Sequence, residues 1–164
     1  MGLLKENISF VVVCYKSSLA LKSLLLSIPK ESEVILVDNS QDKETEEIAN
    51  LYDCILIQNQ ENLGYGAACN IGSKKASGSY IFFINPDSKL MPETLTELIK
   101  AANNYPEASA FNPKIIDQSG KQNFKRRSVL LPKSEWMSRK FPSFDKDISV
   151  LLSLIHISEP TRLL

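Results

Sequence analysis

Short apolar runs recur along the first two thirds of the chain. They are rich in aromatic and β-branched residues and lack the polar alternation of a half-exposed strand. Such runs are typical of strands that are covered on both faces, as in parallel sheets. They occupy residues 8–15, 33–37, 54–57 and 80–84, with a shorter one at 108–111.

Segments with a helical pattern separate these runs. Leu21, Leu24 and Ile28 follow helical spacing, and Pro29 ends that pattern. Further helices are predicted at residues 42–52, where Asp42 is the expected N-cap, at 64–76, and after Pro92. Strands that alternate with helices predict βαβ units, and therefore an α/β domain with a mainly parallel central sheet.

The pattern is weaker beyond residue 112. Residues 117–121 predict a hairpin turn, and residues 125–147 read as a long loop with prolines and scattered charges. Residues 154–162 resemble a translated sequencing-adapter string, so we expect a truncated reading frame whose tail packs poorly. The alternative is a genuine short amphipathic terminus, which should also pack poorly.

Composition narrows the class of protein. With 164 residues the chain is long enough for one domain, and its 19 basic and 19 acidic side chains leave no net field that would favour nucleic acid. Three cysteines beside apolar or small residues suit buried, reduced thiols better than a disulfide framework or a metal site. No stretch approaches a membrane span and no signal peptide is evident, which predicts a cytoplasmic protein.

Three predicted strand ends carry side chains suited to binding a nucleotide. Because ligands of parallel sheets bind outside the carboxyl ends of the strands, Tyr15, Asp38 and residues 85–87 are the first candidates. Tyr15 can cover a base, and Asp38 can accept hydrogen bonds from a nucleobase or ribose. Asp87, beside Asn85, can hold a divalent cation and through it a diphosphate. The alternatives are a half-buried aromatic for Tyr15, a turn or capping acid for Asp38, and a plain turn at 85–87.

Other motifs carry less chemistry. Gly64 and Gly66 imitate half of a dinucleotide fingerprint, but six residues separate them from the preceding strand and Cys69 replaces the third glycine. Close helix–strand packing is therefore unsupported, and the glycines fit a helix start that lets a ligand approach the backbone. Residues 145–147 form a literal D-x-D without a preceding strand, and His156 lacks partners for nucleophilic catalysis.

Five motifs, in this order and spacing, resemble glycosyltransferase family two, especially its rhamnosyltransferase-like branch. The resemblance covers residues 8–127. The motifs lie at residues 11–16 (VVVCYK), 37–40 (VDNS), 62–72 (NLGYGAACNIG), 76–80 (ASGSY) and 85–92 (NPD leading to LMP).

This resemblance implies a Rossmann-like GT-A fold and an inverting, metal-assisted glycosyltransferase. It would transfer a sugar, with rhamnose as a candidate, from a nucleoside-diphosphate sugar to a polysaccharide or lipid-linked glycan acceptor. Asp87 would bind the cation, Mn²⁺ or Mg²⁺. The implied nucleotide-sugar-binding residues are Tyr15, Asp38, Gly64, Gly66, Asn70 and Asn85.

The same resemblance implies a donor-binding domain at 1–127 and the start of a loop-rich acceptor-side region at 128–152. The likeness to an adapter string predicts a non-native tail at 153–164. The catalytic base of the family would lie beyond the chain end and stays unknown. Attachment to the inner face of the membrane would come through missing segments.

The chain departs from the family pattern at Cys14, Lys16 and Asn85. The last of these gives up an anionic charge, which should weaken metal affinity. A non-catalytic nucleotide-binding module and a nucleotidyltransferase remain as alternatives. The latter would need a glycine-rich basic loop directly after the first strand, and residues 16–18 are not one.

Overall fold

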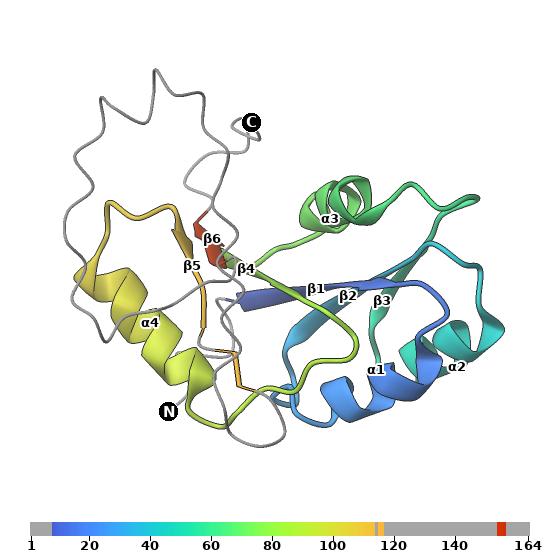
Figure 1. Ribbon diagram of the computed structural model, residues 1–164, viewed down its shortest axis with the longest axis horizontal. Coiled ribbons are helices and arrows are strands. Elements are labelled where there is room, and N and C mark those ends of the chain that lie inside the picture. The colour runs from blue at the N-terminus through green and yellow to red at the C-terminus, as the bar shows by residue number, and fades with distance from the viewer. Residues whose placement is uncertain (1–7, 114, 117–153, 157–164) are drawn as a thin grey trace.

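The computed structural model describes residues 8–113, 115–116 and 154–156, and within them a sheet carries helices on both faces (Figure 1). The strands are β1 (Ile8–Cys14), β2 (Glu33–Asp38), β3 (Ile55–Gln58), β4 (Tyr80–Ile84), β5 (Ala110–Phe111) and β6 (Leu154–His156). The helices are α1 (Ser18–Leu25), α2 (Lys43–Leu51), α3 (Tyr65–Ser73) and α4 (Thr94–Asn104).

The order of strands in this six-stranded sheet is β3-β2-β1-β4-β6-β5. β1 pairs in parallel with β2 and β4, and β2 pairs in parallel with β3. β6 runs antiparallel to both β4 and β5. The mainly parallel α/β sheet predicted from the alternating pattern is confirmed, and the carboxyl ends of its first four strands share one edge, on the right in Figure 1.

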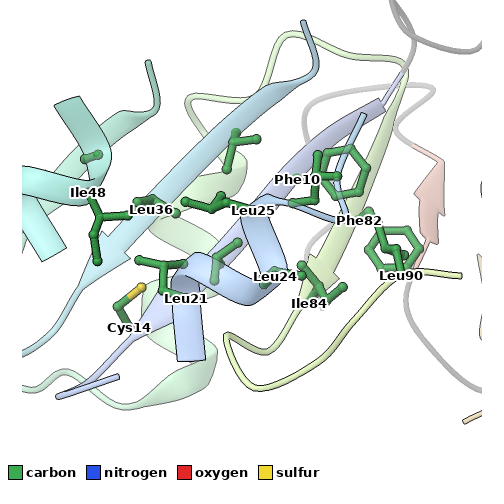
Figure 2. Close-up of a cluster of buried hydrophobic side chains, with 14 of the residues drawn as sticks. Phe10, Cys14, Leu21, Leu24, Leu25, Leu36, Ile48, Phe82, Ile84 and Leu90 are labelled. Carbon is green, nitrogen blue, oxygen red and sulfur yellow. The ribbon is translucent and has the colours of Figure 1, made fainter. Parts of the chain in front are cut away.

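The larger core lies on the sheet face that α1 and α2 cover (Figure 1). Phe10 of β1 and Phe82 of β4 contact each other there, with ring centroids 5.6 Å apart. Figure 2 shows how Leu21 and Leu24 of α1 point toward these strands. Burial of such side chains is the main favourable term in folding, so this face carries most of the stability.

The opposite face is covered by α3, which packs unusually close to the sheet. A Cβ atom on Gly72 would lie 2.4 Å from Cγ1 of Val11 and 3.1 Å from Cγ2 of Val37. Only glycine fits at that separation. Our expectation that close helix–strand packing is unsupported was therefore wrong, because Gly72, one turn after Cys69, provides it.

The segment predicted to be a poorly packed tail contributes β6. Tyr80 lies opposite His156, and Ala110 lies opposite Ile155. Without β6 the edge of β4 would present unpaired backbone N–H and C=O groups, which explains how a short apolar segment adds a strand there. The hairpin predicted at 117–121 and the loop at 125–147 lie outside the described residues.

A hydrogen-bonded carboxylate closes the opposite, amino edge of the sheet. Glu33 accepts hydrogen bonds from the backbone N–H of Ser77 (2.9 Å), from the Ser77 hydroxyl (2.7 Å) and from the Ser9 hydroxyl. Ser9 Oγ in turn accepts from the N–H of Gly78 at 2.8 Å. Desolvation raises the pKa of Glu33, but the hydrogen bonds from Ser77 and Ser9 outweigh it and lower that pKa below its usual 4.5.

Within the described part of the chain, no helix is long and apolar enough to cross a membrane.

Candidate functional site

The carboxyl edge of the sheet brings the predicted site residues together. Cys14 lies opposite Asp38, and Val12 lies opposite Ile84. Tyr15 therefore leaves β1 between the end of β2 and the turn at 85–87. With only β1 between them, β2 and β4 lie about 10 Å apart, twice the usual strand spacing. That separation fits one nucleotide bound across the ends of three strands.

The carboxylate of Asp38 is buried and committed to its own turn. Its Oδ1 accepts hydrogen bonds from the N–H of Ser40 (2.8 Å) and from the Ser40 hydroxyl (2.6 Å), and its Oδ2 accepts from the N–H of Asp42 (2.8 Å). Asp42 caps α2 as predicted, because its side chain accepts from the N–H of Glu44 at 3.2 Å. This geometry agrees with the alternative interpretation of Asp38 as a turn residue.

The turn after β4 is exposed, whereas Asp38 is buried. Asn85 and Asp87 are exposed, and the N–H of Ser88 closes the turn on the carbonyl of Asn85 at 3.0 Å. No described residue makes a hydrogen bond or ion pair with the Asp87 carboxylate in this arrangement. As far as the described residues go, the Asp87 carboxylate is accessible to a ligand.

The donor set at this edge fits a cation that is shared with a ligand. Among the described residues, no group of three or more His, Cys, Asp or Glu side chains converges into a metal cage. Mg²⁺, however, is commonly held by one or two carboxylates, water and substrate phosphates. Asp87 fits that chemistry if a diphosphate supplies the other oxygens.

Tyr15 and Lys16 form the tip of β1. The Tyr15 ring is half exposed, and Nζ of Lys16 lies 5.7 Å from its centroid. Lys16 has a φ of +51°, and its N–H donates to Oγ of Ser40 at 3.1 Å. An exposed aromatic ring at a strand tip can stack on a nucleobase.

The start of α3 is an open surface, as expected from its small residues. Gly64 has a φ of +80°, which favours glycine, and a Cβ on Gly64 or Gly66 would meet nothing within 4 Å. Asn70 is exposed on the same helix. A ligand can therefore approach the backbone here.

Three asparagines to which the sequence analysis gave no role join these elements. Asn39 follows β2, Asn59 follows β3, and Asn62 precedes α3, and all three are hydrogen-bonded to one another as a chain. The available signal was the recurrence of asparagine directly after predicted strands, but asparagine is common in turns and the signal is weak.

The cysteines offer no nucleophile. None of the three is in a disulfide, as predicted. Burial raises the pKa of the Cys14 thiol to about 12, and burial together with Asp53 raises that of Cys54 to about 11. A raised pKa disfavours the thiolate, which is the nucleophilic form of cysteine.

A hollow of roughly 530 Å³ lies between the C-terminal end of α1 and the β4–α4 connection. It is lined by Leu26, Leu90 and Met91, among others. The lining includes Lys89 but none of the predicted site residues, so the hollow is not part of the candidate site. Residues 145–147, the literal D-x-D, lie outside the described residues. The same holds for any catalytic base further along the chain.

The chain is similar in sequence to known proteins. The sequence model of "Glycosyl transferase family 2" matches residues 9–158. The chain is 28% identical over 121 residues to the low-salt glycan biosynthesis hexosyltransferase Agl10 of Haloferax volcanii. It is 29% identical over 124 residues to the poly-β-1,6-N-acetyl-D-glucosamine synthase of Staphylococcus aureus. Each alignment covers 70% of this chain but only 38% and 30% of these relatives, so the chain spans about a third of their length.

The chain is also similar to solved structures. S. aureus TarS 1–349 in complex with UDP-GlcNAc superposes with a TM-score of 0.58 at 26% identity, over 75% of this chain and 36% of TarS 1–349. The mannosyltransferase PcManGT of Pyrobaculum calidifontis, in complex with GDP-Man and Mn²⁺, gives a TM-score of 0.59 over 69% of this chain and 36% of its own. At 18% identity, the second likeness concerns the fold alone.

Proposed function

The chain belongs to glycosyltransferase family 2, and from this premise we propose that it is an inverting, metal-dependent glycosyltransferase that uses a nucleoside-diphosphate sugar. Its GT-A fold is the one predicted from the motifs. One observation carries the proposal. The exposed Asp87 lies at the same sheet edge as the exposed Tyr15 and the open start of α3, which supports the proposal that a base, a diphosphate and a cation bind side by side there.

Each residue at this edge has a proposed task. Tyr15 stacks on the nucleobase, and Gly64 and Gly66 let the donor lie against the backbone. Asn70 and Asn85 offer amide groups to the sugar and the phosphates. Asp38 supports the nucleoside pocket by shaping the turn at its floor, since its carboxylate is already bonded inside the protein.

Asp87 is the proposed ligand of Mn²⁺ or Mg²⁺. The cation would neutralise the charge that develops on the departing diphosphate. Inversion requires the acceptor hydroxyl to attack the anomeric carbon from the face opposite the diphosphate, and a carboxylate must take its proton. We propose that this base comes from the acceptor side, which begins at residues 128–152, after a donor-binding domain at 1–127.

The relatives support a proposal for the substrates. TarS 1–349 binds UDP-GlcNAc, and the curated relatives are a hexosyltransferase and a polymer synthase, which together support a UDP-linked hexose donor and a polysaccharide or lipid-linked glycan acceptor. Rhamnose remains the alternative sugar, on the resemblance of residues 85–92 to the rhamnosyltransferase-like branch. The reaction is proposed to occur in the cytoplasm, at the inner face of the membrane.

Calorimetric titration of the full chain tests the proposal. UDP, UDP-GlcNAc and dTDP-rhamnose are added with Mn²⁺ and, in parallel, with EDTA. We expect metal-dependent binding of at least one nucleotide, and the preferred nucleotide identifies the base. Absence of metal-dependent binding at millimolar nucleotide contradicts the proposal.

A second candidate is a nucleotide-binding module without catalysis, which the lack of an identified base among the described residues favours. Prolonged incubation with the preferred nucleotide sugar separates the two. A transferase slowly hydrolyses its donor, whereas a binding module leaves it intact.

A further inference from the structure

A chain of amide hydrogen bonds connects β2, β3 and the start of α3. Nδ2 of Asn59 donates to Oδ1 of Asn39 at 2.7 Å. Nδ2 of Asn39 donates to Oδ1 of Asn62 at 3.2 Å and to the carbonyl of Gly64 at 3.4 Å. Oδ1 of Asn62 also accepts from the N–H of Gly64 at 3.0 Å. The chain therefore ends on both backbone groups of Gly64.

The network is neutral and mostly buried. Asn39 and Asn59 are only 5% and 9% exposed, while Asn62 is exposed. Buried amides without partners are costly, so such a network persists only when its members are bonded to one another. The side chain of Asn39 is fully engaged inside the protein and is not a direct ligand of the donor.

No neighbouring atom lies where a side chain would begin on the two glycines at the start of α3. A Cβ on Gly64 or Gly66 would meet nothing within 4 Å, and Gly64 is in the left-handed region with a φ of +80°. The buried residues of α3 begin at Ala68, so the hydrogen bonds to Gly64 from the asparagine chain are a specific constraint on the segment before it.

We infer that Asn39, Asn59 and Asn62 are positioning residues, which hold the start of α3 in the conformation that receives the nucleotide-sugar donor. The inference rests on the proposed function. It adds residues that touch no substrate but fix the backbone against which the diphosphate lies.

The direction of the hydrogen bonds makes the inference testable. Donors point from Asn59 to Asn39 and from Asn39 to Asn62 and Gly64, so position 39 must donate whereas position 62 only needs to accept. Aspartate accepts but does not donate when it is ionised. Aspartate should therefore replace Asn62 without loss, while at position 39 it would face two acceptors.

The decisive experiment compares variants of Asn62 by titration of UDP in the presence of Mn²⁺. Because Asn62 is exposed, its substitution should leave the melting temperature within about 2 °C, as is usual for surface positions. Asn62→Ala should weaken UDP binding by about tenfold, the equivalent of one net hydrogen bond. Asn62→Asp, made with Glu61→Gln to conserve net charge, should bind UDP within about twofold of the wild type.

Amide exchange gives a readout that does not depend on the ligand. The Gly64 amide should exchange faster in Asn62→Ala than in the wild type, and its protection should return in the Asp variant, because the carboxylate restores the acceptor. Asn39→Asp should weaken UDP binding more than Asn62→Ala does, since it removes two donated bonds.

Two outcomes overturn the inference while the proposed function stands. In one, the wild type binds UDP and Asn62→Ala binds it equally well. In the other, the charge-matched Asp variant is as weak as the Ala variant. A wild-type chain that binds no nucleotide at all contradicts the proposed function, and the inference fails with it.

Discussion

Two turns at the same edge of the sheet each carry an acid, and the two acids are used differently. Asp38, the last residue of β2, is fully buried and accepts three hydrogen bonds from the turn that follows it. Asp87, after β4, is exposed. The comparison teaches that a strand-end acid indicates the edge where a ligand binds, but only its burial tells whether the acid is available to that ligand.

The backbone that follows each acid explains the difference. The chain after Asp38 turns back so that the N–H groups of Ser40 and Asp42 converge on the carboxylate, and Asp42 then begins α2. After Asp87, the N–H of Ser88 donates to the carbonyl of Asn85 at 3.0 Å, and the N–H of Leu90 donates to Oγ of Ser27 at 3.0 Å. Donors therefore gather around Asp38 and not around Asp87.

The largest expected effect comes from introducing an acid at position 84, three residues before Asp87. Ile84 is buried at the end of β4, so Ile84→Asp places an unpaired charge in the core and should cost about 4 kcal/mol or more of unfolding free energy. Ile84→Val, the control, should cost about 1 kcal/mol. Urea denaturation followed by circular dichroism measures both. A cooperatively folded Ile84→Asp variant of nearly normal stability would show that β4 is not central.

The second largest loss of stability is expected when the buried acid, Asp38, is removed. Asp38→Ala should lower the free energy of unfolding by about 3 kcal/mol, because three donors lose their acceptor. Asp38→Asn should cost less, since it keeps one acceptor oxygen. The same denaturation assay checks this order. If Asp38→Ala is as stable as the wild type but loses nucleotide binding, Asp38 is a ligand-binding residue and the comparison between the two turns fails.

A third acid, Glu33 at the amino edge of the sheet, extends the comparison because its contribution to stability depends on pH. Glu33 is hydrogen-bonded by Ser77 and Ser9 and has a lowered pKa, so its stabilising contribution is present above about pH 4.5 and is lost as the pH falls through the lowered value. Glu33→Gln should cost about 1 kcal/mol at pH 7. The difference in unfolding free energy between Glu33→Gln and the wild type, measured by urea denaturation, should shrink below pH 4. A difference that is constant with pH refutes the role of the ionised carboxylate.

Much of the fold followed from the sequence because its apolar runs are strong and regular. The parallel strands and the helices of the described residues were predicted to within a few residues, and Asp42 was identified as a cap. Gly72 was missed because the dinucleotide fingerprint directed attention to Cys69, and the tight contact depends on Val11 and Val37, which are distant in sequence.

The sequence predicted which edge of the sheet carries the candidate site, but it did not predict the hydrogen bonds between the side chains there. Strand ends could be aligned from the pattern, so Tyr15, Asp38 and Asp87 were expected near one another. Which side chains turn inward could not be derived, because burial of Asp38 and bonding among Asn39, Asn59 and Asn62 depend on how three separate turns meet.

The smallest effect on stability and the most direct test belong to the exposed acid. Asp87→Ala should change the free energy of unfolding by less than about 0.5 kcal/mol, as expected for an exposed loop residue. It should, however, abolish the increase in UDP affinity that Mn²⁺ gives the wild type, and Asp87→Asn should do the same. The deciding measurement is UDP titration with Mn²⁺ and with EDTA on both variants. Loss of the metal effect in a stable protein is the predicted result, and an unchanged metal effect contradicts the assignment of Asp87 and with it the proposed site.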